Sequence, residues 1–569
     1  MNKGFLDYIL NYPKKYNLSI FSNLDYEDNK WIEYYTKQLL SKQYDSDKEL
    51  ANIYRNRSSH YFRLCDYNKC KDDLEKSENL FKNVDNLVSF SFIYEKLKDY
   101  NKAIECLTKY KLEMPEEEYI DDYINNLSKV IEFNNCNLIK NKFVLLRKWV
   151  LDNGGNLDLI KVNYQTNDNR DVLSSNNISM DDKILRIPLK CLITTELGKE
   201  TNIGKEILEK GIQLISNHNW ITFVLLETFS NKDSYFYSYV DIMPKEFNNV
   251  PINFSEYYIK KLSGSQCIQC IDNRRILLMN DYVNLKKNID SFRNYNYNDY
   301  LWARTVVITR IYGIIINSKK TQALVPFADM LNHKIDPKTR WTFNDKDKFF
   351  EITSNGSILK DCPITDSYGY KCNSRFFVNY GFVLDNNIDN KSEFIIDLNS
   401  NDFNLVNLKF KLNTSYKFGT LTKCYNDFVN FLSIIRYYIC EDIELIKNSL
   451  SNFLIPISIE NEILVLKHLL RICIKHLKQY SSSLKEDSNV LLDPLYKYNY
   501  HNSNIRNCIL VIYGEKLIYD YYMKLALLGI KILRKDFLEL IKTNLLLDSL
   551  NSMYKRYISE NIYILYNFN

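Results

Sequence analysis

Gly and Pro, which form turns and end helices, and His, which often binds metals, are scarce in this sequence. Only 14 Gly, 10 Pro, 6 His and 5 Trp occur in 569 residues. The sequence contains no Gly-rich phosphate-binding loop, no H-E-x-x-H zinc motif and no Ser-centred nucleophile elbow. A lone C-x-x-C, Cys267 to Cys270, has no second pair or nearby His to complete four zinc ligands. We therefore expect no metal site and none of the enzyme classes that depend on these motifs.

Charge of one sign is also lacking. The 75 Lys and Arg residues nearly balance 70 Asp and Glu, which leaves a net charge of +5. So small an excess creates no strong field, so we expect neither a nucleic-acid nor a membrane partner.

Long apolar runs and a paired set of cysteines are missing as well. No uninterrupted run reaches the ~18 residues that span a bilayer, and the first residues lack the apolar core of a secretory signal. The 13 cysteines are scattered and odd in number, which favours a reducing compartment without a disulfide framework. The sequence thus predicts a soluble protein of the cytoplasm or nucleus.

The composition that is present is that of a folded protein. Hydrophobic residues make up 45% and charged residues 25% of the chain, and its length fits roughly three to four domains.

A weak internal repeat marks the N-terminal part, residues 1–135. The segment Tyr61–Cys70 aligns with Tyr94–Ala103, and Pro115 follows the second copy. This pattern resembles tetratricopeptide repeats, which pair helices across small residues and bind partner proteins. A generic helical bundle is the alternative. We expect a helical segment that can recruit a protein partner.

The pattern of apolar and polar residues changes near residue 140. Residues 145–151 form an amphipathic pattern that ends at Asn-Gly-Gly155, and alternating segments that indicate strands follow. Helical stretches lie between them, which predicts an α+β fold over 140–385 with a helical insertion at about 200–300. Residues 386–569 return to helical periodicity. The expected strands include 183–188 and 349–352, and the expected helices include 220–228, 257–262, 302–316, 463–474 and 507–533.

Three pieces of sequence stand out: Ala323–His333, which ends in Asn-His; Ser367-Tyr-Gly369; and Asn373–Phe382, which contains a second Tyr-Gly. Their order resembles the core of SET-domain methyltransferases, in the branch of the Rubisco large-subunit lysine methyltransferase and the actin-histidine methyltransferase. The resemblance runs from about 140 to 545. It also covers residues 185–188, 193–196, 239–244, 262–265, 302–303, 309–310 and 505–516.

The resemblance implies a SET-domain fold of small β-sheets, flanked by the N-terminal repeats and a C-terminal substrate-binding domain. It also implies methylation of a protein lysine with S-adenosylmethionine, on a non-histone, ribosomal or cytoskeletal type of substrate. Such chemistry needs a neutral nitrogen held in line with the methyl group in a dry channel, with a Tyr hydroxyl to orient it.

The family roles pass to matching positions of this chain. Tyr368 matches the catalytic tyrosine, and Tyr380 and Tyr312 match aromatic residues of the channel wall. Phe382 matches the ring that stacks on adenine. The remaining cofactor positions are Asn332, His333, Arg310, Glu196 and Asp329.

The chain departs from the family pattern at three places. Residues 167–175 contain no Gly where a Gly-rich turn contacts the cofactor, and Asp361-Cys-Pro363 replaces an acidic turn. Asp366 occupies a channel position that is usually apolar, where it would raise the pKa of an incoming lysine. These departures keep an inactive SET scaffold as an alternative.

The target residue has two readings. The histidine-specific branch has Trp at the position of Ala328 and lacks Tyr at that of Tyr380. The sequence therefore favours lysine, with histidine as the alternative.

Overall fold

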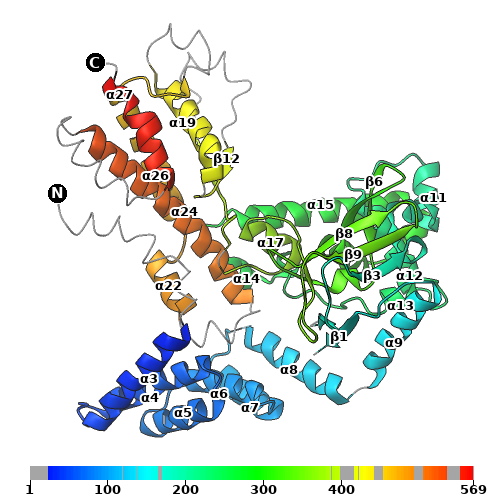
Figure 1. Cartoon of the computed structure of the whole chain (residues 1–569), viewed down its shortest axis with the longest axis horizontal. Helices are drawn as coiled ribbons and strands as arrows, with labels where there is room; N and C mark the ends of the chain where they lie inside the picture. Colours follow the sequence, from blue (N-terminus) through cyan, green and yellow to red (C-terminus); the bar gives the residue numbers. More distant parts are fainter. Residues whose placement is uncertain are drawn as a thin grey trace.

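The computed structural model describes most of the chain (Figure 1). The described residues are 24–117, 119–135, 137–164, 170–385, 387–396, 415–420, 422–440, 453–492, 504–534 and 552–567. No helix in these ranges combines the length and apolar character needed to cross a membrane. The mixture of abundant helix and small separate sheets confirms the α+β prediction.

The N-terminal part consists of consecutive helices, drawn in blue in Figure 1. Two of its interhelical turns have the same backbone geometry, because Cys65 (φ 60°) and Lys98 (φ 62°) both adopt positive φ. Each is followed by an Asp that caps the next helix: Asp66 accepts from Lys69 N, and Asp99 accepts from the equivalent Lys102 N. The repeat in the sequence therefore corresponds to a repeat in the backbone structure. Its assignment to the tetratricopeptide type stays a prediction. The helices are α3 (Leu24–Ser41), α4 (Asp47–Arg63), α5 (Tyr67–Leu80), α6 (Asp85–Lys96), α7 (Tyr100–Glu113) and α8 (Tyr119–Asn135).

Small sheets form the middle of the chain, at the right of Figure 1. Two of them have three strands, in the orders β3-β9-β8 and β4-β6-β5, and each is antiparallel. β1 pairs with β2, and β7 pairs in parallel with β10. The bounds are β1 (Ile160–Tyr164), β2 (Arg170–Ser174), β3 (Lys183–Pro188), β4 (Ile193–Thr194), β5 (Tyr312–Ile316), β6 (Lys319–Leu324), β7 (Asn332–His333), β8 (Thr339–Asn344), β9 (Phe349–Ser354) and β10 (Thr365–Asp366).

Helices fill the connections within this region. β3 and β9 contain the two predicted strands, α9 contains the predicted helix at 145–151, and α12 and α14 match the predicted helices at 220–228 and 257–262. The helices are α9 (Asn137–Asp152), α10 (Thr195–Glu200), α11 (Asn202–Glu209), α12 (His218–Phe229), α13 (Tyr237–Val240), α14 (Glu256–Lys261), α15 (Cys267–Asn288), α16 (Tyr297–Arg310) and α17 (Asn373–Tyr380).

One predicted helix was wrong at its C-terminal end, over residues 311–316. The sequence favoured a helix over 302–316, but α16 ends at Arg310 and Tyr312–Ile316 is strand β5. Asn317 and Ser318 both have positive φ and close a two-residue hairpin between Ile316 and Lys319. A run of β-branched isoleucines pairs here with β6, so tertiary pairing overrides the helical reading.

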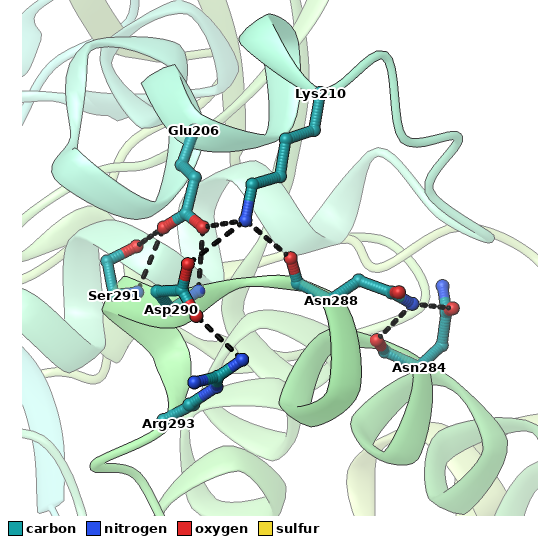
Figure 2. A network of polar contacts seen from close by, with 7 residues as sticks. All are labelled: Glu206, Lys210, Asn284, Asn288, Asp290, Ser291 and Arg293. Atoms are coloured by element: carbon teal, nitrogen blue, oxygen red, sulfur yellow. Dashed lines mark hydrogen bonds and ion pairs between the residues drawn. The ribbon is translucent and has the colours of Figure 1, made fainter.

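A polar clamp ties α11 to the turn after α15 (Figure 2). Glu206 accepts hydrogen bonds from Ser291 Oγ (2.6 Å) and from the backbone N–H groups of Asp290 and Ser291. Lys210 donates to Glu206 (2.6 Å) and to the Asn288 carbonyl (2.9 Å). These contacts join two parts of the helical insertion to each other and involve none of the motif residues.

The C-terminal part is a set of packed helices, yellow to red in Figure 1. Its core is continuous with that of the N-terminal repeats through α14 and α17, whereas the sheets enclose a separate core. α24 joins the C-terminal helices to the middle of the chain, because it contacts α21 as well as α14 and α17. The elements are β11 (Ser392–Ile395), β12 (Ser415–Phe418), α19 (Tyr425–Ile439), α21 (Ile459–Leu477), α22 (Leu484–Leu492), α24 (Asn504–Leu533), α26 (Ser552–Tyr557), the π-helix Ile558–Ile562 and α27 (Ile564–Asn567).

Candidate functional site

The parallel pair of β7 and β10 brings the first two motifs together. Asp366 lies opposite His333 in the register, so Tyr368 follows directly beside the Asn-His pair. The Tyr368 N–H donates to His333 Nδ1 (3.0 Å), and its hydroxyl donates to the Leu331 carbonyl (2.7 Å). Burial raises the pKa of Tyr368, so the phenol remains neutral. Both ends of this side chain are therefore held by the Asn-His segment.

The third motif completes an aromatic cluster around Tyr368. α17 ends at Tyr380, and Gly381 at φ 76° turns the chain so that Phe382 comes back against the same rings. The Tyr368 and Tyr380 ring centroids are 4.9 Å apart, and Phe382 lies 5.8 Å from His333 and 6.0 Å from Tyr368. Three pieces that are separate in sequence thus form one apolar wall.

Arg310 and Asp329 form a buried ion pair close enough to Tyr368 for both charges to affect its pKa. Arg310 Nη1 donates to the Asp329 carbonyl (2.9 Å) and lies 3.3 Å from its Oδ2. The side chains are 13% and 0% exposed, and burial raises the pKa of Asp329 despite the guanidinium charge. Arg310 Nε has no hydrogen-bond partner among the residues that the structure describes. A buried donor left in this way is costly unless a ligand accepts from it.

His333 provides a second buried donor, after Arg310 Nε, that has no partner in the described part of the chain. Since Nδ1 accepts from Tyr368, a neutral ring carries its proton on Nε2. Burial lowers the pKa of His333, which keeps the ring neutral. Nε2 is buried and has no partner within the described ranges.

Tyr312 joins Asp366 to the cluster from β5. Its hydroxyl lies 2.9 Å from the Ala328 carbonyl and 3.3 Å from Asp366 Oδ2. Burial raises its pKa well above that of a free tyrosine. Asp366 also accepts from the Ser367 N–H at 2.7 Å, and burial raises the pKa of this carboxyl to about 6.

Asn332 connects the cluster to β2, which takes up residues 170–174 of the Gly-free segment. Its Nδ2 donates to Asp171 Oδ1 (2.6 Å) and lies 3.4 Å from the Arg170 carbonyl. Both residues belong to β2, whereas residues 167–169 of the expected cofactor turn lie outside the described residues. Asn332 thus places the end of this hairpin at the edge of the site. At the other replaced turn, Asp361 pairs with Lys161 of β1.

Glu196 is not brought to this cluster. Its side chain is 69% exposed and pairs with Lys199 at 2.9 Å. It borders a separate pocket of about 510 Å³ on the β5–β6 hairpin, lined also by Trp220, Gly313 and Gln322. An ion pair between Glu196 and Arg310 is not observed either, because Arg310 pairs with Asp329. The cofactor role of Glu196 has no support in this placement.

Residues outside the predicted set also belong to the cluster. Phe376 packs on His333 (4.8 Å) and Phe382 (5.2 Å), and its position four residues before Tyr380 on a helix was the available signal. Lys371 Nζ lies 5.8 Å from the Tyr380 ring centroid and contacts the Tyr368 carbonyl. Cys267 of the C-x-x-C is buried and Cys270 exposed. In the described part of the chain, no three His, Cys, Asp or Glu residues gather as metal ligands.

Curated relatives match across this region. The chain is 25% identical over 271 residues to the actin-histidine N-methyltransferase of Gallus gallus, covering 46% of this chain and 45% of that protein. It is 23% identical over 377 residues to the enzyme of Mus musculus, covering 61% and 63%. The match thus spans less than two thirds of the length of these relatives. A family model described as Rubisco LSMT substrate-binding matches residues 409–518.

Solved structures match in fold. The SET domain of LSMT bound to lysine and AdoHcy superposes with a TM-score of 0.59 at 18% identity, covering 75% of this chain and 98% of that one. Rubisco LSMT bound to AdoMet gives 0.58 at 18% identity, with 71% and 96% covered. These comparisons confirm the SET-domain fold and the predicted resemblance to the branch that includes Rubisco LSMT and the actin-histidine N-methyltransferases.

Proposed function

We propose that this chain is an S-adenosylmethionine-dependent methyltransferase that modifies a side-chain nitrogen of a protein. The observation that supports this best is the convergence of Tyr368, Tyr380 and His333 into one cluster beside the Arg310–Asp329 pair. The relatives and structural neighbours carry names of the same chemistry.

The residues present fit this cofactor. His333 Nε2 and Arg310 Nε are buried donors without partners in the described structure, beside an aromatic surface that includes Phe382. A ligand that combines a carboxylate, ribose hydroxyls and a flat adenine ring satisfies such a mixture of groups. Asn332, His333, Arg310, Asp329 and Phe382 are the residues that we propose to hold it. The cofactor supplies an activated methyl group on a positively charged sulfur.

The chain's own residues orient the target nitrogen. Because Tyr368 donates its only hydroxyl proton to the Leu331 carbonyl, its oxygen is available as an acceptor. It can accept from an N–H of the target or from polarised C–H groups. Tyr380 and Tyr312 complete an apolar lining that excludes water and favours an uncharged nitrogen.

The target residue has two candidates. Ala328 and Tyr380 support lysine, as the sequence comparison suggested. The names of the curated relatives support histidine. Actin is consequently the first purified substrate to test, and the helical repeats and C-terminal helices are the parts that we propose to select the protein partner.

The direct test is transfer of labelled methyl groups from the cofactor into purified actin and lysate proteins. We expect incorporation with the wild-type chain and with Tyr370→Phe, because Tyr370 is 70% exposed. We expect strong loss with Tyr368→Phe. Incorporation that survives Tyr368→Phe unchanged would refute the proposed catalytic site.

The rival function is an inactive scaffold, which the Gly-free turn and Asp366 motivate. Calorimetric titration with S-adenosylhomocysteine separates the two. Binding in the micromolar range supports the enzyme, whereas absence of binding together with absence of labelling supports the scaffold.

A further inference from the structure

Asp366 is a buried carboxylate beside Tyr312, and the function proposed above gives it no role. It is 3% exposed and lies on β10 opposite His333. Its Oδ2 lies 3.3 Å from the Tyr312 hydroxyl, and its charge helps to raise the pKa of Tyr368. Burying a carboxylate is expensive, so its hydrogen bonds decide whether it is structural or awaits a ligand.

The hydrogen bonds of Asp366 are incomplete. Oδ1 accepts the Ser367 N–H at 2.7 Å. Oδ2 faces only the Tyr312 hydroxyl, which has a single proton and lies closer to the Ala328 carbonyl, at 2.9 Å against 3.3 Å. The shorter contact takes the proton. Within the described structure, Oδ2 therefore has no full donor when the carboxyl is ionised.

We propose, on the basis of the methyltransferase function above, that Asp366 is a specificity-determining residue that accepts an N–H from the target and thereby selects a histidine imidazole over a lysine amine. A neutral imidazole offers one N–H and one lone pair at once. With the N–H held by Asp366, the other nitrogen is fixed as the nucleophile, because the hydrogen bond sets the tautomer.

The same carboxylate disfavours lysine. A lysine amine has a pKa of ~10.4 in water and must lose a proton before it can accept a methyl group. A carboxylate next to it stabilises the ammonium and raises that pKa further. Imidazole, at ~6.5, is mostly neutral near pH 7 and meets no such obstacle.

The transfer also balances with Asp366 in this position. The imidazole lone pair forms the new N–C bond, and the electron pair of the broken C–S bond returns to sulfur. Positive charge develops on the ring, where the carboxylate stabilises it. The remaining N–H proton then passes to Asp366 and on to water, leaving neutral methylhistidine. A carboxyl whose pKa burial raises to about 6 is suited to both accept and release this proton.

The test identifies the labelled residue by mass spectrometry after reaction of the full chain with lysate proteins. We expect methylhistidine from the wild type, and loss on the order of 10²-fold with Asp366→Leu. Asp366→Asn, which keeps an acceptor oxygen but no charge, is expected to fall between them. Asp361→Asn is the control, because it removes an exposed acid that pairs with Lys161. Methyllysine as the wild-type product, or equal histidine labelling with Asp366→Leu, would overturn the proposal.

A second readout does not need the methyl donor. ¹⁵N-labelled 4-methylimidazole is added to the full chain saturated with S-adenosylhomocysteine, and the nitrogen shifts of the bound ring report its tautomer. We expect one tautomer with the wild type and the mixture found in water with Asp366→Leu. The same mixture in both proteins would refute the role of Asp366. Absence of labelling with a clear tautomer difference would instead count against the proposed transferase activity alone.

Discussion

Two buried polar networks in this molecule differ in how completely they are satisfied. In the C-terminal helices, Arg436 is fully buried, and its five donors all have acceptors. Glu462 binds it through two contacts of 2.7 and 2.8 Å and also accepts from Tyr557. Around Tyr368, by contrast, Arg310 Nε and His333 Nε2 have no partner among the described residues, and Asp366 Oδ2 has only the 3.3 Å contact with the Tyr312 hydroxyl.

This difference distinguishes buried polar groups that stabilise the fold from buried polar groups that are available to a ligand. A closed network stabilises packing and leaves nothing for a ligand, whereas open donors and acceptors cost stability until a ligand binds them. On this view, loss of the first network unfolds the protein, and changes in the second alter binding and catalysis.

The largest effect is expected for Glu462→Ala. It leaves the Arg436 charge buried without its counter-ion, so the free energy of unfolding should fall by about 3–5 kcal/mol. Urea denaturation measures the change. The double variant Arg436→Met with Glu462→Leu removes both charges and should recover much of the loss. Equal destabilisation by the single and double changes would contradict the argument.

Tyr368→Phe should lower the methyl-transfer rate on the order of 10²-fold, because an oriented hydroxyl is lost from the cluster. The free energy of unfolding should fall by only about 1 kcal/mol, since a single hydrogen bond to the Leu331 carbonyl disappears. Single-turnover kinetics and urea denaturation measure the two effects. A large stability loss with a small rate loss would place Tyr368 among the structural residues.

Asp366→Asn should stabilise the protein in a pH-dependent way. In the unfolded chain the carboxyl has a pKa of ~3.9, and in the folded chain burial raises it to about 6. Near pH 3 and below, both states are mostly protonated and the carboxyl costs little. Between pH 4 and 6 the folded state binds more protons, so wild-type stability falls as pH rises.

The advantage of Asp366→Asn over the wild type should therefore grow from about zero at pH 3 to on the order of 3 kcal/mol at pH 7. Urea denaturation at the two pH values measures it. A constant difference at both would show that Asp366 does not carry a raised pKa.

The smallest effect is expected for Arg310→Lys. The ammonium can keep the charge near Asp329 but has no Nε donor in the guanidinium plane, so S-adenosylhomocysteine should bind about 10-fold more weakly. Calorimetric titration measures the affinity. Arg436→Lys serves as the comparison, because it should weaken folding and leave the affinity of the folded protein unchanged.

Much of the fold could be read from the sequence because it follows local rules. Apolar periodicity and capping residues such as Asp66 and Asp99 specify their helices without distant partners. The segment Tyr312–Ile316 could not be predicted in this way. Its isoleucines suit either a helix or a strand, and pairing with β6 decides between them.

The motif residues of the candidate site were found by order and spacing, and most of them lie together. Tyr368, Tyr380, His333 and Phe382 share one cluster, whereas Glu196 lies on α10 beside a different pocket. Matching by sequence treats Glu196 and the cluster residues alike, because a sequence does not show in which direction a side chain points.

The sequence alone determined the residue types that can do the chemistry: the Asn-His pair, the tyrosines, and an acid where an apolar residue is usual. Only the tertiary structure decided which of their polar atoms are already satisfied. A hydrogen bond depends on a few tenths of an ångström between residues far apart in the chain. The distances of 2.9 and 3.3 Å at Tyr312, which give Asp366 only the longer contact, arise only when β5, η5 (Ala328–Met330) and β10 are packed together.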